Sequence, residues 1–193
     1  MRLARLLGPD ECVLVGGLAV GVHGHVRATG DLDFVTRRPL AETRERLRKA
    51  GIAGRLQRGD ALEGGFSSLT GEIDGIPFDV LPPLVPVAWD HALALDMPGG
   101  TIKVVDLDSL LQLKFRAGGH QDLLDVARLV LLHPEVETRA IELATAYGAT
   151  DRFEAWLHDP RTRAQAREDA EREAARSEKA RPARRGPGTR RRS

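Results

Sequence analysis

The sequence predicts an α/β (α+β) protein in which short strands and helices alternate before a helical C-terminal part. Residues 12–15 form a short, apolar, β-branched run that is typical of a buried strand. Residues 69–73 and 76–81 are strand-like and are joined by Asp74-Gly75, a dipeptide that favours a hairpin turn. With 193 residues, of which 41% are hydrophobic, the chain can bury one compact core.

The other elements of the first 105 residues follow from local signals. Pro39 suits the start of a helix and Gly51 suits its end. Residues 52–68 are glycine-rich and leave their structure open, and residues 84–100 are expected to form a loop with a short helix near 89–95. The predicted helices here are 2–7, 18–25 and 40–50, and the further predicted strands are 31–36 and 101–105.

The C-terminal part is expected to be helical throughout. Asp108 or Ser109 can cap a helix over 110–116. The further predicted helices are 121–132, 135–147 and 150–158, followed by a polar helical pattern over 161–180 with almost no apolar stripe. We therefore expect a core over 1–105, a helical part packed on it over 106–160, and a polar helix with a disordered tail over 161–193.

The net charge of +1 hides an acidic body and a basic tail. Residues 161–193 hold 12 Lys and Arg against 5 Asp and Glu, a balance of +7, so residues 1–160 carry −6. Residues 181–193 are rich in Pro, Gly and Arg and are expected to be disordered. From Lys179 onward there are seven basic residues and no acid, so the tail either binds RNA phosphates or is only a solubilising terminus.

Several protein classes are disfavoured by composition. Cys12 is the single cysteine, which excludes an intrachain disulfide and suits a reducing cytoplasm. The longest apolar run, residues 12–22, is about half of what a bilayer requires, so we expect a cytoplasmic protein without a membrane partner. The histidines lack zinc-site spacing, and no Gly-x-Ser-x-Gly elbow supports a serine hydrolase.

Gly16 and Gly17 lie between the first predicted strand and the following helix. Such a turn lets backbone N–H groups point at an anion, although glycine also serves tight turns for steric reasons alone. No Gly-Lys-Ser/Thr tripeptide occurs, which excludes a P-loop, and Leu18 replaces the middle glycine of a dinucleotide-binding fingerprint. The pair is therefore either a phosphate site of another kind or a structural turn.

Asp31 and Asp33 are the most informative pair in the sequence. Because side chains alternate along a strand, both carboxylates face one way while Leu32 and Phe34 face the core. Two such charges repel each other unless a cation lies between them, and Mg²⁺ takes carboxylate oxygens while bridging to phosphates. A solvated acidic strand end is the simpler alternative, but the Gly-Gly turn a helix length earlier favours the metal site.

Asp79 is a carboxylate in the middle of an apolar strand, where it needs a compensating partner. The second strand of the hairpin can lie beside the strand of Asp31, which would bring Asp79 to the same metal ions. The alternative is an acid on the exposed face of an edge strand.

Together these segments resemble the nucleotidyltransferase fold of the polymerase-β type. The resemblance rests on Gly16-Gly17, on residues 27–35 (Arg-Ala-Thr-Gly-Asp-Leu-Asp-Phe-Val), and on residues 78–80 (Phe-Asp-Val). A later stretch, with a lysine at 114 and Asp-x-x-Asp over 122–125, is similar to small AbiEii-like bacterial nucleotidyltransferases of toxin–antitoxin systems. The similarity spans residues 10–132.

The resemblance implies a mixed sheet flanked by helices, with residues 1–105 as the catalytic core. It further implies that Asp31, Asp33 and Asp79 are catalytic and bind two Mg²⁺ (or Mn²⁺) ions. Metals in such a site neutralise phosphates and lower the pKa of the attacking hydroxyl group. Asp79 would serve as a metal ligand or as the general base.

The same resemblance implies a site for a nucleoside triphosphate. Gly16 and Gly17 would hold the triphosphate, and Lys114 would bind phosphate as a point charge. Asp122 would orient Lys114 or contact the nucleotide. Judged without the resemblance, Lys114 would be an ordinary solvated helical lysine. His120 stands where the family has arginine or lysine, which weakens a phosphate contact at neutral pH.

The acceptor of the nucleotidyl group stays open. One alternative is RNA, for instance tRNA, reached through the basic tail by a toxin that has a cognate antitoxin. A second is a small hydroxylated compound, as in the related antibiotic nucleotidyltransferases. A third is a nucleotide-binding or partner protein without catalysis, against which the retention of three carboxylates argues.

Overall fold

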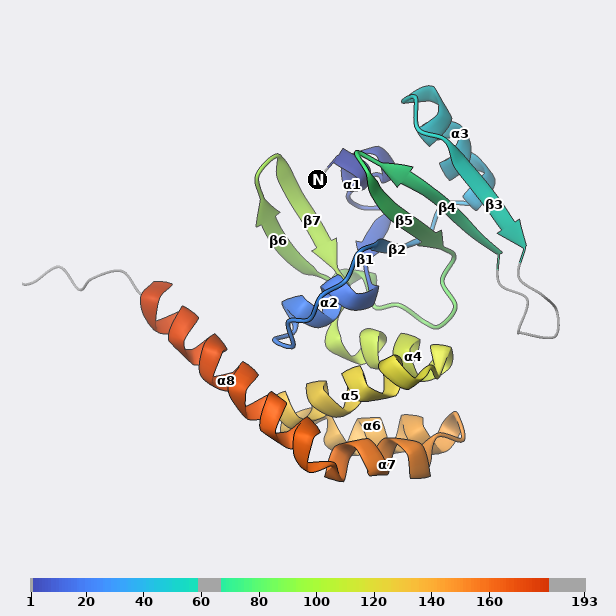
Figure 1. Cartoon of the computed structure of the whole chain (residues 1–193). Coiled ribbons are helices and arrows are strands. Elements are labelled where there is room, and N and C mark those ends of the chain that lie inside the picture. Colours follow the sequence, from blue (N-terminus) through green and yellow to red (C-terminus); the bar gives the residue numbers. More distant parts are fainter. Residues whose placement is uncertain (1, 59–66, 181–193) are drawn as a thin grey trace, which may run out of the picture.

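The computed structural model describes residues 2–58 and 67–180, in which the strands form one mixed sheet. The strand order is β3-β4-β5-β2-β1-β7-β6 (Figure 1). Strand β2 is parallel to β5 and β1 is parallel to β7, whereas the other neighbours are antiparallel. The strands are β1 Cys12–Leu14, β2 Leu32–Thr36, β3 Gly54–Arg58, β4 Ser67–Ile73, β5 Ile76–Leu81, β6 Leu93–Met97 and β7 Gly100–Val104.

Helices flank this sheet, as predicted. Helices α1 and α3 contact each other on one side, whereas α4 to α8 form a layer on the other side, with α2 between the sheet and α4 (Figure 1). Two 3₁₀ turns, Trp89–His91 and Pro134–Val136, complete the elements. The helices are α1 Arg2–Leu7, α2 Gly16–Val22, α3 Leu40–Lys49, α4 Leu107–Ala117, α5 His120–Leu132, α6 Glu137–Ala146, α7 Thr150–His158 and α8 Pro160–Ala180.

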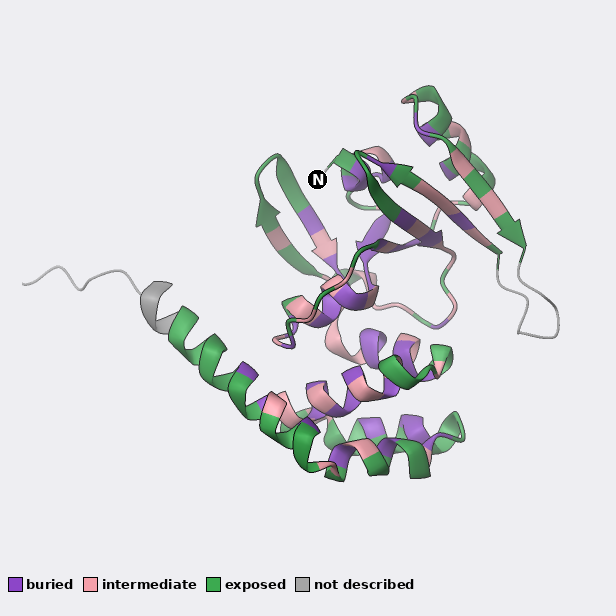
Figure 2. Ribbon diagram, viewed as in Figure 1, coloured by how far each residue is buried: buried purple, intermediate pink, exposed green. Residues whose placement is uncertain are grey.

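The core lies along the central strands and the helix faces that cover them (Figure 2). Val13, Phe34 and Val80 are at most 1% exposed, so β1, β2 and β5 are buried where they meet. Leu32 and Phe34 are both buried, which confirms that this alternating set of β2 faces the core. Asp33 and Val35 are consequently directed to the opposite face, which is covered at Val35, a fully buried residue.

The predicted hairpin is confirmed. Strands β4 and β5 pair antiparallel from Ile73 and Ile76 outward. Asp74 has φ 53° and Gly75 has φ 78°, the two positive values that a type I′ turn requires. This turn sets the register of β5, and therefore the place of Asp79.

Two edge strands, β6 and β3, were not predicted from the sequence. The loop prediction is wrong for residues 93–97, which form β6 and pair with β7 through a turn at Pro98 and Gly99. Strand β6 lies at the edge of the sheet and is mostly exposed, so it lacks the alternation that marks a half-buried strand. Strand β3 forms within the segment that the sequence left open.

The capping prediction for α4 is also wrong. Asp106, not Asp108 or Ser109, is the N-cap, and its carboxylate accepts a hydrogen bond from the Ser109 amide at 3.1 Å. Asp108 lies in the first turn and instead pairs with Arg139 of α6 at 2.8 Å. The helix begins at Leu107, three residues before the predicted start, because the chain turns directly from Val105, the last residue bonded to the sheet, into the Asp106 cap.

Helix α8 packs against α5 and α7 although its sequence is polar. Its buried residues Thr162, Ala166 and Asp169 recur at intervals of three to four, which places them on one helical face. The tail predicted as disordered, residues 181–193, lies outside the described residues, as does the segment 59–66. No described helix has the length and apolarity needed to cross a membrane.

Candidate active site

Three carboxylates predicted from the sequence meet where β2 and β5 run side by side. Asp33 lies directly opposite Asp79 in the parallel ladder, and Asp31 immediately precedes β2 on the same face. The prediction that the hairpin strand lies beside the Asp31 strand is confirmed, since β5 is hydrogen-bonded to β2 and is not an edge strand. The sheet therefore presents three acids at one place.

Two of these acids, Asp33 and Asp79, have raised pKa values. Burial, together with the charges of Asp31 and Asp79, raises the pKa of Asp33 to about 6, against the opposing effect of Lys114 and Arg27. Burial and the charge of Asp31 also raise the pKa of Asp79. The ionised site is thus held together against electrostatic repulsion, which a bound cation would relieve.

The donor set fits a hard divalent cation. Carboxylate oxygens are the ligands that Mg²⁺ and Mn²⁺ prefer, and Asp31, Asp33 and Asp79 share one face of two neighbouring strands. Within residues 2–58 and 67–180, no group of three or more His, Cys, Asp or Glu side chains is already close enough to hold a metal ion. The carboxylates would therefore have to draw together around a cation.

Gly16 and Gly17 give the acids and their neighbours room. Gly16 has φ 65°, and a Cβ atom there would overlap the Asp33 carboxylate. A Cβ atom at Gly17 would lie 2.8 Å from the Thr29 hydroxyl and 3.0 Å from the Arg27 guanidinium. Glycine is therefore required at both positions because Asp33, Thr29 and Arg27 approach the main chain too closely to leave room for a Cβ atom. Contact of the two glycines with a triphosphate stays a prediction.

Gly16→Ala is expected to destabilise the protein by about 1–3 kcal/mol and to displace Asp33, because alanine adds backbone strain and a steric overlap. Gly75→Ala is the matched control: Gly75 has φ 78°, but no atom lies within 4 Å of the place that a Cβ atom would occupy. Thermal unfolding and divalent-metal titration of both variants separate the two effects. Equal metal affinity in both variants would contradict a role for Gly16 in placing Asp33.

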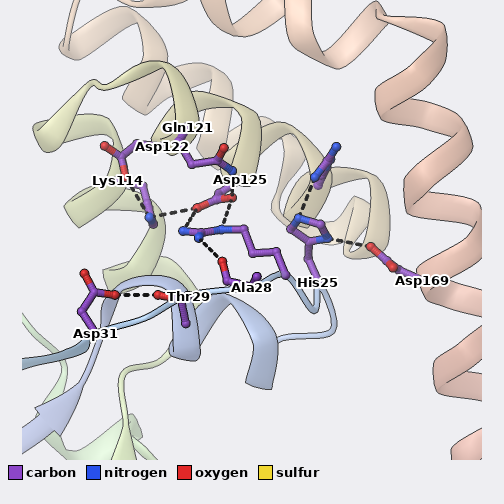
Figure 3. A network of polar contacts seen from close by, with 11 residues as sticks. His25, Ala28, Thr29, Asp31, Lys114, Gln121, Asp122, Asp125 and Asp169 are labelled. Atoms are coloured by element: carbon purple, nitrogen blue, oxygen red, sulfur yellow. Dashed lines mark hydrogen bonds and ion pairs between the residues drawn. The ribbon is translucent and has the colours of Figure 1, made fainter. Parts of the chain in front are cut away.

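A second cluster of charges joins the loop before β2 to helices α4 and α5 (Figure 3). Arg27 donates from Nε and Nη2 to the two oxygens of Asp125, each at 3.0 Å. Lys114 lies 2.7 Å from Asp122 and 3.0 Å from Asp125. Its side chain is 8% exposed, so it is a buried, paired lysine and not a solvated one.

Asp125 is the centre of this cluster and is fully buried. Burial alone would raise its pKa, but the hydrogen bonds from Arg27 and the charge of Lys114 prevail and hold the pKa below its usual value. Gln121 donates a further hydrogen bond to the same carboxylate at 2.7 Å. Asp125 thus stays ionised and holds two cations beside the three acids of the sheet.

Asp122 and Thr29 orient the groups around them. Asp122 bonds Lys114 through one oxygen and accepts from the Gly119 amide through the other, at 3.2 Å, so the start of α5 fixes its position. Asp122 therefore contacts Lys114, and its role in orienting that lysine for a nucleotide stays a prediction. The Thr29 hydroxyl donates to Asp31 at 2.6 Å and holds a carboxylate that is otherwise exposed.

A cavity of about 700 Å³ lies beside these groups and is lined by several of them, but not by Asp79 or Asp125. This volume lies within the range of small-molecule and cofactor sites. Asp31, Asp33, Arg27 and Lys114 line one part of it, while the remaining wall is largely apolar. The apolar lining residues are Val15, Leu81, Leu84, Leu110, Leu113 and Ala117.

Four of the residues that hold the site are not among the predicted site residues. Asp125 carries the clearest missed signal, because it is an acid among Leu123, Val126 and Ala127 on the buried face of α5. Arg27 precedes the acids by a few residues only, and nothing local indicates that it pairs with a carboxylate 98 residues later. Thr29 and Gln121 have no distinctive local pattern.

No family model and no curated protein matches the sequence. Among solved structures, the chain is similar to a "putative nucleotidyltransferase" from Thermotoga maritima, with 18% identity and a TM-score of 0.46 over 61% of this chain and 83% of that one. It is also similar to a "putative nucleotidyltransferase" from H. pylori, with 14% identity and a TM-score of 0.39 over 94% and 96%. Likenesses this distant assign no function by themselves.

Proposed function

We propose that this chain is a metal-dependent nucleotidyltransferase that moves a nucleoside monophosphate from a nucleoside triphosphate to a hydroxyl group. The observation that carries the proposal is a cavity lined by Asp31 and Asp33 on one part and by Arg27 and Lys114 on another, with Asp79 paired to Asp33 in the ladder behind it. Concentrated carboxylates next to cations suit a substrate that brings both a divalent metal and phosphates.

Asp31, Asp33 and Asp79 are the residues that would hold Mg²⁺ or Mn²⁺. When bound, the metal supplies charge neutralisation of the phosphates and acidifies the attacking hydroxyl. Asp79, whose pKa is raised by burial and by Asp31, is suited to take the proton of that hydroxyl as general base. The hydroxyl oxygen then bonds the α-phosphorus, the bond to the β-phosphate oxygen breaks, and pyrophosphate leaves.

The cations of the site act on the phosphates. Lys114 lies at the cavity but is paired with Asp122 and Asp125, so its charge is positioned before substrate arrives and is partly neutralised. Arg27 is held by Asp125 and is 23% exposed, which leaves part of its guanidinium open to the cavity. Gly16 and Gly17 allow the substrate's phosphates to approach the main chain closely.

The acceptor that we propose is RNA, with tRNA as an example, modified by a toxin that has a cognate antitoxin. The support is compositional: seven basic residues and no acid from Lys179 to Ser193 form a segment that phosphates would attract. Deleting residues 181–193 should then weaken RNA modification and its salt dependence while leaving transfer to a small acceptor unchanged. Unchanged RNA modification would favour a small hydroxylated compound.

The test is label transfer from each α-labelled nucleoside triphosphate, with Mg²⁺ or Mn²⁺, to total RNA and to a panel of small hydroxylated compounds. We expect transfer by the natural chain and a loss of about 1000-fold in Asp31→Asn and in Asp79→Asn, because each removes several kcal/mol of transition-state stabilisation. Asp10→Asn is the matched control, since Asp10 is exposed and lies before the first residue of β1, whereas the site lies after the last one. Transfer that survives both site variants would overturn the assignment.

A further inference from the structure

The connection between α2 and β2 carries site residues without being part of a helix or a strand. Residues 24–31 contain Arg27, Thr29 and Asp31, yet their main-chain hydrogen bonds back to α2 end at His25. A segment of this kind adopts one conformation only if side chains from elsewhere hold it. The helical layer supplies those side chains.

His25 is the most deeply buried polar contact of this segment. Its side chain is 2% exposed, and its Nδ1 lies 2.6 Å from a carboxylate oxygen of Asp169 on α8, which is also 2% exposed. Its Nε2 lies 2.9 Å from Nη1 of Arg128 on α5. Figure 3 shows the His25 ring between the segment and α8, directed at Asp169.

The chemistry of these partners determines where the His25 proton lies. A guanidinium only donates hydrogen bonds, so Nε2 of His25 accepts from Arg128. The ring proton is therefore on Nδ1 and is donated to Asp169. The neutral ring thus bridges a buried anion and a partly buried cation, and these two directional hydrogen bonds fix the ring plane and with it the course of the main chain.

The start of the segment has a separate anchor. His133, at the end of α5, bonds the carbonyl oxygen of His23 at 2.9 Å, and the His23 ring bonds the carbonyl oxygen of Val105 at 2.8 Å. Arg27 is held by Asp125 of α5. His25 lies between the His23 and Arg27 contacts, and it is bonded to Asp169 of α8, 144 residues away in the sequence.

Asp169 also contacts two residues of its own helix, but these contacts are longer than its hydrogen bond to His25. Its other oxygen lies 3.3 Å from Gln165 and 3.6 Å from Arg172, both on α8, and these contacts are longer than the 2.6 Å bond to His25. Because shorter hydrogen bonds to a charged acceptor are the stronger ones, the segment is its principal partner.

We propose that Asp169 is a positioning residue of the active site, which through its hydrogen bond to His25 holds residues 24–31 so that Arg27 and Asp31 face the cavity. The catalytic consequence rests on the proposed nucleotidyltransferase function, whereas the structural coupling does not. Helix α8 is, on this view, part of the site's support and not a solvated appendage.

Four variants of the full chain test the proposal. Asp169→Ala and His25→Ala should each lower kcat by about 10–100-fold, the usual effect of removing a group that orients catalytic residues. The double variant should lose no more than either single one, because both changes break the same link. Asp169→Asn keeps an oxygen that accepts the Nδ1 proton and should stay within a few-fold of the natural chain.

Hydrogen exchange of backbone amides provides a readout that needs no activity. Asp169→Ala should raise exchange at the amides of Gly24 and His25, which bond to Gly21 and Val20 of α2, while β1 and β2 stay protected. The control is Glu168→Ala, since Glu168 is 59% exposed on the same helix and contacts only Arg172 at 3.5 Å among the described residues. It should change neither exchange nor kcat.

Distinct outcomes would overturn the proposal. Unchanged exchange at the amides of Gly24 and His25 would show that Asp169 does not hold the segment. A uniform rise over all strands and helices would indicate global destabilisation only, and additive losses in the double variant would show that Asp169 acts without His25. If the natural chain transfers no nucleotide, the proposed function fails, while the exchange pattern still decides whether Asp169 positions the segment.

Discussion

Asp33→Asn is expected to abolish nucleotide transfer and, at the same time, to make the metal-free protein more stable at neutral pH. The loss of transfer should reach about 1000-fold or more, equivalent to about 4 kcal/mol, because one of three carboxylates for the metal is gone. The gain in stability follows because Asp33 is an acid beside two other acids, with its pKa raised to about 6 by burial and by Asp31 and Asp79.

The pH dependence of this gain has a definite sign. An acid whose pKa is about 6 in the folded protein and 3.8 in the unfolded chain binds its proton more tightly in the folded state. Its contribution to stability is therefore fully present below pH 3.8 and is lost as the pH rises through 6. A pKa difference of this size corresponds to about 3 kcal/mol, and contact with solvent reduces this to about 1–3 kcal/mol.

Urea unfolding from pH 4 to pH 8, without divalent metal, measures the effect. Asp33→Asn should match the natural chain near pH 4 and exceed it above pH 7, whereas Asp10→Asn should follow the natural chain throughout. Added Mg²⁺ or Mn²⁺ should stabilise the natural chain and not Asp33→Asn, because only the folded site binds the ion. Equal stabilisation of both by metal would show that the ion binds elsewhere.

Asp125→Ala is expected to destabilise the protein by about 3–5 kcal/mol, the largest stability effect that the structure indicates. Asp125 is fully buried and holds Arg27 and the buried Lys114, so its removal leaves two cations without their shared anion. Its pKa is lowered by the Arg27 and Lys114 contacts. Its contribution is therefore present above pH 3.8 and is lost as the pH falls through the lowered value, opposite in sign to that of Asp33.

Asp108→Ala is the matched control for this change. Asp108 also pairs with an arginine, Arg139, but both side chains are more than 40% exposed, so the cost should stay below about 1 kcal/mol. Replacing all three members, as in Asp125→Leu with Arg27→Met and Lys114→Met, should recover much of the stability because no buried charge remains unpaired. Denaturant unfolding measures all three, and a cost of Asp125→Ala as small as that of Asp108→Ala would contradict the prediction.

The hairpin and the central strands could be predicted because their signals are local. Asp74-Gly75 requires positive φ at both positions, and the alternation after Gly30 distinguishes Leu32 and Phe34 from the two aspartates. Strand β6 and the Asp106 cap escaped prediction for the opposite reason. An exposed edge strand has no buried face to produce a pattern, and the start of α4 depends on where the sheet releases Val105.

The sequence by itself determined which residue types are concentrated at the site: Asp31 and Asp33 two apart on a strand, Asp79 in an apolar strand, and the glycine pair before them. These features lie within short segments, where backbone periodicity and turn chemistry dominate. Only the tertiary structure decided that Asp33 and Asp79 are ladder partners and that Asp125 holds Arg27 and Lys114. It also joined His25 to Asp169 across 144 residues. Such pairings depend on which elements pack together. An acid among apolar residues, such as Asp125, marks a buried charge in the sequence, but nothing local identifies the distant partner that its burial requires.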